Sequence, residues 1–494
     1  MNKFKRFQVF RLVLLLALVV RLFQLSADMP LYISPCADEG IYVHNARNQV
    51  LFGEWVLDDW NNMYISPIFN YFVYLSFSLF GVGFVQARLV SVAASLVTIW
   101  LVFACLKNSA GIKAALLAGL LLSVNYVYVA FGKMALMEPA MIMFMALAMY
   151  FFLRGGGRGT FLFLCGVCCS LAFITKNLAG FYFIVPYAAL FPGGRARGKL
   201  RRFSLLLAGQ LSVISVWFFT WYLPNRGFID LHNRIKIEER APVSAAGALI
   251  NAAAMFRNPF FGMVPLLGAA ALIGLLIVVL AAARRKRIGA VELYALLWLA
   301  ANFACLSVFS WRPLRYFLSL LVPMVILAVV PLFGKSGTGE RGGGVLTALY
   351  PPRWRKGVMT CTSLLVAASL LWSAYNLGWT WLHPRSMWPS LAREIRERIP
   401  GAAVISGGPA MSAGMGIKNR LVWIHQLADY SRGDPFARYG IDCLVVDGRE
   451  LEFYKRVFPD VLPRLMKESR LVYRMPLDDR GAALFIKLPA EQSD

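Results

Sequence analysis

Eleven long apolar runs are the feature that most constrains how this chain can fold. A helix needs about 20 mostly apolar residues to cross the hydrocarbon core of a bilayer. Charged residues make up only 16% of the chain, whereas soluble globular domains average about 25%. The sequence therefore predicts a polytopic α-helical membrane protein with about 11 spans. The runs are residues 8–27, 87–106, 113–131, 137–153, 160–175, 178–192, 203–223, 261–283, 289–309, 315–333 and 358–379.

The net charge is +25, and the basic residues behind it are distributed as the predicted topology requires. If the N-terminus is cytoplasmic and the runs alternate, the cytoplasmic segments carry 22 Lys and Arg residues against one acid, Glu340. The basic residues are densest in 195–202 and 284–287. This is the positive-inside pattern of membrane proteins. The basicity is thereby explained, and nucleic acid is excluded as a partner.

Residues 66–81 are apolar but short, and they contain an early proline, Pro67. If they crossed the membrane, the basic cluster 284–287 would move to the outer side, against the positive-inside pattern. We therefore expect an interfacial or re-entrant helix on the outer face.

Residues 380–494 differ from the rest of the chain, because the long apolar runs stop there. After eleven spans this part lies outside, and its pattern predicts a small extracytoplasmic α/β domain. The predicted division is 1–379 for the transmembrane domain, with 28–86 as its first extracytoplasmic loop, and 380–494 for the α/β domain. Strands are expected at 402–405, 442–448, 471–475 and 482–488, and helices at 391–399 and near 449–468.

Several ionisable residues stand next to the apolar runs at their outer ends. Such groups are costly at membrane depth and commonly mark a functional site. Acids and bases that converge on one side of the membrane predict a polar cavity that binds an anionic ligand. These residues are Asp38, Glu39, Lys133, Glu138, Lys176, Arg312 and Arg315.

This set of residues favours sugar transfer from a lipid-linked phosphate donor. A carboxylate can deprotonate an acceptor hydroxyl as it attacks the anomeric carbon of the sugar. The phosphate leaving group requires Arg or Lys to stabilise its developing charge. Nucleotide donors are disfavoured, since the site faces away from the cytoplasm and the chain has no nucleotide-binding motif. A polyprenyl phosphate sugar would reach such a site through the bilayer.

Five sequence motifs resemble those of C-type glycosyltransferases, in the order of that family. They are most similar to the protein O-mannosyltransferase group and to the bacterial aminoarabinose transferases that modify lipid A. The matches run across 37–323. They are ADEGIYVHNARNQVLFGEW (37–55), SPIFNYFVYLSFSLFG (66–81) with QARLVS (86–91), FGKMALMEPAMIMF (131–144), AFITKNLAGFYFIVP (172–186) and RPLRYFLSLLVP (312–323).

The resemblance implies roles for individual residues. Asp38 becomes the expected catalytic base, with Glu39 beside it to position acceptor or donor. Asp58 and Asp59 are adjacent, unlike the DxD metal pair of oligosaccharyltransferases, and we interpret them as a loop turn. No obligatory metal and no other cofactor is expected, while a divalent ion that assists stays open. Ile65 stands where the lipid A branch has a lysine, so either another cation contacts the phosphate or the donor geometry differs. Contacts to the donor phosphate or sugar are expected from Lys133, Glu138, Lys176, Arg315 and Tyr316.

Other interpretations remain open at this point. The pair Asp38 and Glu39 could simply begin a helix, and Lys176 could be an anchor at the end of a span. A transporter or flippase of a lipid-linked sugar would also bind phosphate, although we see no internal repeat. A non-catalytic envelope scaffold would leave the convergent charges unexplained.

The function expected is transfer of a single sugar from a polyprenyl phosphate donor to an extracytoplasmic lipid, glycan or protein. The expected location is the bacterial inner membrane.

Overall fold

The structure is a computed structural model in which two compact units are described separately. The helical unit comprises Met1–Phe23, Ser91–Lys133 and Met137–His383. The α/β unit comprises Gln24–Val90, Met134–Leu136 and Pro384–Asp494. The residues described are 3–29, 38–58, 61–155, 158–191, 196–239, 244–284, 288–309, 312–333, 349, 351–424, 434–477 and 481–489.

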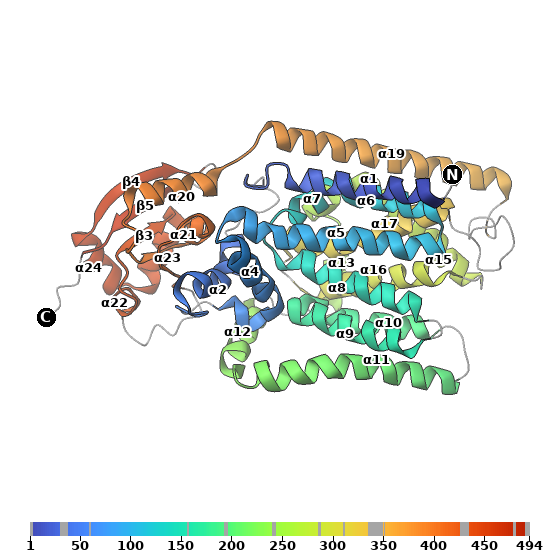
Figure 1. Cartoon of the computed structure of the whole chain (residues 1–494), viewed down its shortest axis with the longest axis horizontal. Coiled ribbons are helices and arrows are strands. Elements are labelled where there is room, and N and C mark those ends of the chain that lie inside the picture. The colour runs from blue at the N-terminus through green and yellow to red at the C-terminus, as the bar shows by residue number, and fades with distance from the viewer. Residues whose placement is uncertain are drawn as a thin grey trace. The chain divides into compact units, whose positions relative to one another are not determined.

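The helical unit is a bundle in which α9 packs between α8 and α11 and α15 packs beside α17 (Figure 1). Helix α5 begins in the α/β unit and continues into this one. The elements are α1 (Lys3–Leu22), α5 (Phe84–Ser109), α6 (Ile112–Val124), α7 (Tyr126–Gly132), α8 (Met137–Arg154), α9 (Gly159–Thr175), η1 (Asn177–Phe183), α10 (Ile184–Leu190), α11 (Ala196–Trp217), η2 (Phe218–Tyr222), α12 (Arg226–Glu239), α13 (Ala245–Met255), α14 (Pro259–Met263), α15 (Pro265–Ala283), α16 (Ala290–Val308), η3 (Leu314–Phe317), α17 (Leu318–Phe333) and α19 (Pro352–Leu382).

Each of the eleven apolar runs overlaps at least one helix. Among the described residues, six helices are long and apolar enough to cross a membrane, and a seventh span is possible if the bent pair α6 and α7 counts as one. The expectation of a polytopic helical membrane protein is confirmed at this level, whereas the count of about 11 spans stays a prediction. The shorter apolar helices are Pro67–Phe80, Gly159–Thr175, Asn177–Leu190 and Leu314–Val330.

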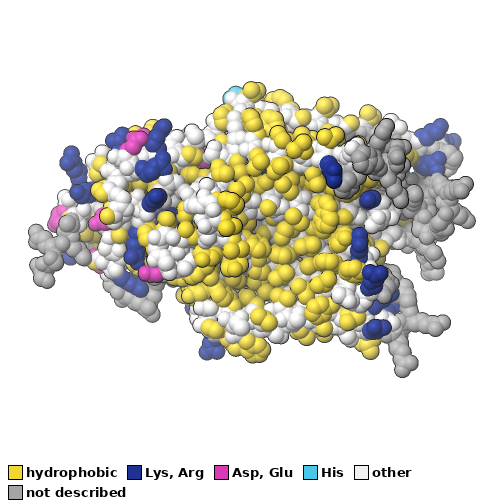
Figure 2. Space-filling model, in the orientation of Figure 1, with side chains coloured by type: hydrophobic (Ala, Val, Ile, Leu, Met, Phe, Trp, Pro, Cys, Tyr) yellow, Lys and Arg dark blue, Asp and Glu magenta, His cyan; other side chains and the backbone are white. Residues whose placement is uncertain are grey.

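The outer helices of this unit present apolar side chains to their surroundings. In α11, Leu207 and Leu211 are about half exposed, and in α19 Leu364 and Leu371 are more exposed still. Figure 2 shows a broad hydrophobic surface over the helices. An exposed apolar surface of this extent is stable only against lipid, since water would make it prone to association.

The bend between α6 and α7 is 62° and lies at Asn125. The Asn125 side chain accepts a hydrogen bond from the Tyr128 backbone N–H, so it caps the start of α7. Arg21, which is fully buried, donates to the carbonyls of Leu122 and Ser123 at the end of α6. The break is thus stabilised because side chains satisfy the backbone groups that it frees.

The α/β unit contains a five-stranded mixed sheet with the order β2-β1-β3-β5-β4. Strand β1 pairs in parallel with β2 and β3, while β5 pairs antiparallel with β3 and β4. The elements are α2 (Asp38–Phe52), α3 (Asn62–Ile65), α4 (Pro67–Phe80), α20 (Met387–Arg398), β1 (Ile405–Ser406), α21 (Gly408–Ala413), η4 (Gly414–Gly416), β2 (Leu421–Val422), α22 (Pro435–Arg438), β3 (Cys443–Val446), α23 (Gly448–Val457), α24 (Val461–Glu468), β4 (Arg470–Pro476) and β5 (Ala482–Lys487).

Strand β3 shows how the sheet is covered on both faces. Cys443 and Val445 pack in one cluster with Leu391 of α20, while Leu444 and Val446 pack in another with Tyr454 of α23. Alternate residues of a strand point to opposite faces, so a continuous apolar run such as this is typical of a strand buried on both sides. Each of the four predicted strands coincides with or overlaps an observed one.

The α/β unit also includes residues 24–90, which the sequence assigned to the transmembrane domain. The physical reason is hydrogen bonding across the unit, for example from Arg47 to the Gly414 carbonyl. The boundary between 379 and 380 stays a prediction. Helix α4 has 14 residues, about 21 Å in length, which is shorter than the hydrocarbon core of about 30 Å. This length supports the expectation that 66–81 is interfacial or re-entrant.

Candidate active site

Helix α2 begins with the two acids that the sequence singled out, Asp38 and Glu39. Acids in a first turn are favoured because the helix dipole places partial positive charge there. Their surroundings nevertheless differ, since Asp38 is half-buried whereas Glu39 is only 8% exposed. Of the two, Asp38 is the more accessible to a substrate.

Glu39 is held by a bidentate ion pair with Arg88 of α5. Arg88 Nε lies 2.8 Å from Glu39 Oε1, and Arg88 Nη2 lies 2.7 Å from Oε2. Oε1 also accepts a hydrogen bond from the Ala135 backbone N–H at 2.7 Å. Planar bidentate pairs are strong and directional. Both oxygens of Glu39 are therefore engaged.

Arg88 also fixes the segment that follows α1. Its Nη1 donates to the carbonyls of Leu25 and Ala27, and its Nη2 lies 3.5 Å from Asp28 Oδ1. Asp28 accepts a hydrogen bond from the Trp388 backbone N–H. Burial raises the pKa of Asp28 to about 6, although the positive charge of Arg88 opposes this rise. Arg88 thus joins two acids and two carbonyls into one buried network.

A second charged cluster lies in the helical unit around Glu138, at the start of α8. Glu138 is fully buried, and its Oε1 lies 2.5 Å from Lys176 Nζ and 3.3 Å from Arg315 Nε. Lys176 stands where α9 ends, and Arg315 lies in η3. Three segments that are far apart in the sequence therefore converge, as expected from their positions beside the apolar runs.

Tyr316 completes this cluster, which we call the Glu138 cluster: Glu138, Lys176, Arg315 and Tyr316. Lys176 Nζ lies 4.6 Å from the centre of the Tyr316 ring, and Arg315 Cζ lies 5.5 Å from it. Both distances are within the range of cation–π attraction. Two cations against one carboxylate leave a formal charge of +1, which suits an anionic ligand.

Lys133 is placed differently. It caps α7, is 3% exposed, and donates from Nζ to the Phe23 carbonyl at 2.6 Å. Phe23 follows the last residue of α1, so this bond satisfies a carbonyl that the helix leaves unpaired. This hydrogen bond gives Lys133 a structural role at the end of α1, and its expected contact with the donor stays a prediction.

The sequence interpretation placed Asp58 in a loop turn, and the structure has it in a bend between α2 and α3. Its side chain is nevertheless buried, at 8% exposure. Its Oδ2 lies 2.8 Å from His44 Nε2 and accepts the Trp423 backbone N–H at 2.7 Å. Sequence spacing gave no sign of either partner. Asp59 lies outside the described residues.

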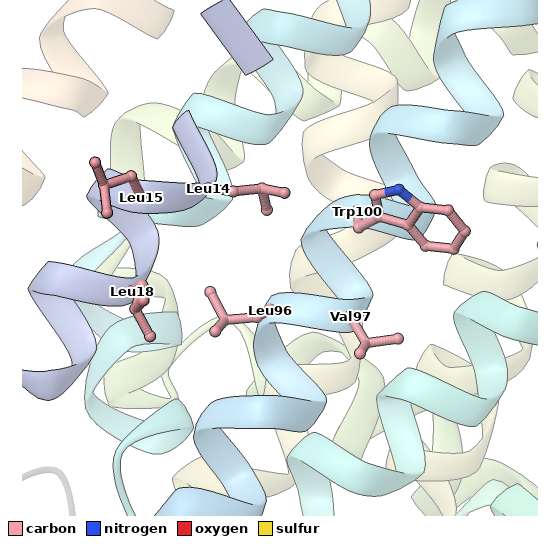
Figure 3. A pocket seen from close by; sticks show the side chains of 6 residues that line it. All are labelled: Leu14, Leu15, Leu18, Leu96, Val97 and Trp100. Atoms are coloured by element: carbon pink, nitrogen blue, oxygen red, sulfur yellow. The ribbon is translucent and has the colours of Figure 1, made fainter. Parts of the chain in front are cut away.

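An apolar groove of about 440 Å³ lies between α1 and α5. Figure 3 shows leucines of α1 facing Leu96, Val97 and Trp100 of α5. None of its six lining side chains is titratable, so the groove can contact hydrocarbon but supplies no group for catalysis. Within the described part of the chain, no cluster of three or more His, Cys, Asp or Glu side chains could hold a metal ion.

Arg88, Asp28 and Arg47 were missed as functional candidates. Arg88 stands in QARLVS, a segment that was matched to the family without a role for the arginine. The sequence did contain a signal for Arg88, since a single arginine near the start of a long apolar run requires a partner. Arg47 lies within a polar helix, where nothing in its spacing indicates burial.

Sequence comparisons match parts of this chain to known proteins. Residues 65–221 match the family model described as dolichyl-phosphate-mannose-protein mannosyltransferase. Over 329 residues the chain is 26% identical to an undecaprenyl phosphate-alpha-4-amino-4-deoxy-L-arabinose arabinosyl transferase of Edwardsiella ictaluri, covering 63% of this chain and 58% of that protein. An uncharacterized protein of Aquifex aeolicus is 28% identical over 201 residues, which are 38% of this chain and 40% of that protein.

Solved structures share the fold at low sequence identity. ArnT from Cupriavidus metallidurans, bound to undecaprenyl phosphate, has a TM-score of 0.64 at 17% identity and covers 98% of both chains. The resemblance to the C-type glycosyltransferases is confirmed. The archaeal oligosaccharyltransferase AglB from Archaeoglobus fulgidus has a TM-score of 0.55 at 13% identity, covering 100% of this chain and 75% of that one. At these identities the solved structures show a shared fold, and the chain spans 58% of the curated arabinosyl transferase that it matches.

Proposed function

We propose that this C-type glycosyltransferase moves one sugar from a polyprenyl phosphate donor to an extracytoplasmic lipid, glycan or protein. The observation that carries the proposal is the Glu138 cluster, a buried group of charged side chains with a net positive charge inside a unit built for the membrane. A lipid-linked phosphate is an anion that reaches such a position through the bilayer. The match to ArnT, a protein solved with undecaprenyl phosphate bound, supports this class of donor.

The reaction is a single displacement at the anomeric carbon. The acceptor oxygen forms a bond to that carbon while the bond from the carbon to the phosphate oxygen breaks. The acceptor hydroxyl passes its proton to Asp38, which acts as general base. The phosphate leaves with an additional negative charge, which Lys176 and Arg315 stabilise. No step requires a metal.

Glu39 has a positioning role in this proposal. Its two oxygens bind Arg88 and the Ala135 N–H, so they are occupied by the protein itself. The half-buried Asp38 is the more accessible of the two acids, and the proposal assigns proton transfer to it. Inversion at the anomeric carbon follows from a single displacement.

The proposed location is the bacterial inner membrane, with a cytoplasmic N-terminus and an extracytoplasmic α/β fold in 380–494. The basic residues of the segments assigned to the cytoplasm support this orientation. The acceptor would then be a component of the cell envelope.

The experiment is a transfer assay on the purified protein in nanodiscs. A panel of radiolabelled polyprenyl phosphate sugars is offered with an envelope extract to the wild type, to Asp38→Asn and to Glu54→Gln. Loss of the general base should lower kcat by about 10²–10⁴-fold in Asp38→Asn. Glu54 is an exposed acid just beyond α2 and serves as the matched control.

Label transfer by the wild type and Glu54→Gln, with none by Asp38→Asn, is the expected result. Full activity of Asp38→Asn would remove Asp38 from the mechanism. If the wild type binds a donor tightly but transfers no label, and it moves that donor across a liposome bilayer, the transporter alternative holds instead.

A further inference from the structure

Helix α2 is buried although much of it is polar. Nine of its 15 residues are buried, and His44, Asn45, Arg47 and Asn48 are among them. Burial of polar groups costs free energy unless hydrogen bonds replace those to water. The polar contacts of α2 therefore help to determine its position, together with buried apolar residues such as Val43 and Ala46.

Arg47 makes the most extensive of the contacts shown for this helix. It is 1% exposed and binds three backbone carbonyls: Nε donates to Gly414 at 2.8 Å, and Nη2 donates to Ile417 at 2.9 Å and to Asn419 at 2.6 Å. All three carbonyls belong to the segment 414–419, which connects α21 to β2. Burial lowers the pKa of Arg47 to about 9, so the guanidinium remains charged at neutral pH.

Two further contacts fix α2 to the same region of the α/β fold. Gly40 packs so closely against α21 that an added Cβ would lie 1.8 Å from the Met411 carbonyl oxygen. His44 bonds to Asp58, which accepts the Trp423 N–H beside β2. Residues 411–423 thus hold α2 at Gly40, at Arg47 and, through Asp58, at His44.

We infer that Arg47 is a positioning residue, which orients α2 against the segment 414–419 so that Asp38 is held in its working position. This inference rests on the proposed role of Asp38. The C-terminal α/β fold then contributes to sugar transfer by holding α2, although none of its own residues enters the reaction.

Asp38 and Arg47 are far enough apart along α2 that a small tilt of the helix would displace Asp38. Arg47 lies nine positions after Asp38, which is about 14 Å along a helix. A tilt of about 5° at the Arg47 end therefore moves Asp38 by about 1 Å. Displacements of about 1 Å can reduce the rate of an enzyme about 100-fold. A purely structural role would instead lower the amount of folded protein and leave kcat unchanged.

The test compares Arg47→Met, Arg47→Lys and Arg396→Met in the full-length protein in nanodiscs. Methionine keeps much of the side-chain volume without a donor, and lysine keeps a charged donor without the planar fork. Arg396 of α20 is the matched control, since it is exposed and donates to the Gly416 carbonyl of the same segment. The measurements are kcat and donor KM, together with hydrogen exchange of α2 amides and of β3 amides.

Arg47→Met should lower kcat about 100-fold with little change in donor KM, and Arg47→Lys should recover part of the loss. Amides of α2 should exchange faster while those of β3 keep their protection. Arg396→Met should match the wild type in both measurements.

Unchanged kcat and α2 exchange in Arg47→Met would overturn the inference. It would also be overturned if both Arg47 variants lost protection in β3 together with α2, because that result describes general unfolding. Failure of the proposed function is distinguishable: the wild type would then show no transfer, while the exchange data would still report whether Arg47 holds α2.

Discussion

Asp38 and Glu39 are neighbours in the chain, but their exposure and their partners differ in the folded protein. Successive residues of a helix point about 100° apart. Glu39 consequently faces Arg88, while Asp38 stays half-exposed. The sequence marks both acids as candidates for one site, and their separate roles depend on where Arg88 lies.

Removal of Arg88 should destabilise the α/β unit. In Arg88→Met, Glu39 becomes a buried charge without its bidentate partner, which costs about 3–5 kcal/mol. The double variant Glu39→Gln/Arg88→Met should lose less than the sum of the single variants, because the unpaired charge is gone. Denaturant titration in detergent measures both effects. If Arg88→Met unfolded with the same denaturant midpoint as the wild type, this account of the ion pair would be contradicted.

Neutral substitutions in the Glu138 cluster should affect use of the donor. Lys176→Ala and Arg315→Ala each remove one cation that the proposal places on the phosphate. A lost charge-assisted hydrogen bond is worth about 1.5–3 kcal/mol, or about 10–150-fold in kcat/KM for the donor. Steady-state kinetics with varied donor concentration measures this change. Wild-type kinetics in both variants would show that phosphate binds elsewhere.

Several residues of the cluster could be predicted because each stands beside a long apolar run. Glu138, Lys176 and Arg315 share that feature, and they do converge. The same reasoning grouped Lys133 with them, whereas its ammonium binds the Phe23 carbonyl. Sequence position indicates the side of the membrane but leaves the partner undetermined.

At the scale of secondary structure, α23 and the β1–α21 connection are joined by Glu450. Both carboxylate oxygens of Glu450 lie 2.8 Å from the Gly408 backbone nitrogen, and the Tyr454 hydroxyl donates to Oε1. Burial raises the pKa of Glu450 to about 7, and these hydrogen bonds oppose the rise. Gly407 has a φ of +127°, which favours glycine there.

This raised pKa predicts how stability depends on pH. Between the ordinary glutamate pKa and about 7, the folded state binds a proton at Glu450 that the unfolded state has released. Stability should therefore fall as the pH rises from 6 to 8. Glu450→Gln should flatten that dependence, since an amide does not titrate in this range.

Thermal unfolding at pH 6, 7 and 8 measures this effect. Glu452→Gln is the matched control, because Glu452 lies on the same helix with a side chain 66% exposed. An equally steep pH dependence in Glu450→Gln and the wild type would show that Glu450 is not responsible.

The secondary structure of this protein was more predictable than its side-chain contacts. Apolar runs and alternating patterns indicated the helices that overlap the eleven runs and four of the strands, because hydrophobic periodicity reflects local geometry. Strand β2 was missed, since it comprises just Leu421 and Val422. Two residues are too few to show a pattern.

At the scale of the whole molecule, the membrane topology makes a direct prediction. A reporter fused after residue 380 should score as extracytoplasmic, and one fused within 195–202 should score as cytoplasmic. The physical reason is the excess of Lys and Arg in the segments assigned to the inner side. Paired alkaline phosphatase and fluorescent protein fusions measure both positions. A cytoplasmic score after residue 380 would contradict the proposed site of transfer.

The sequence alone determined that this chain is a helical membrane protein with charged residues gathered beside its spans. Hydrophobic length and charge bias are local properties, and water and lipid act on them in the same way in any fold. The tertiary structure alone decided that Arg88 binds Glu39 and that Arg47 of α2 binds the Gly414 carbonyl, 367 residues away in the sequence. It also decided that Asp58 is buried against His44. These partners are far apart in sequence, and a hydrogen bond depends on distance and direction in space, which residue order does not encode locally.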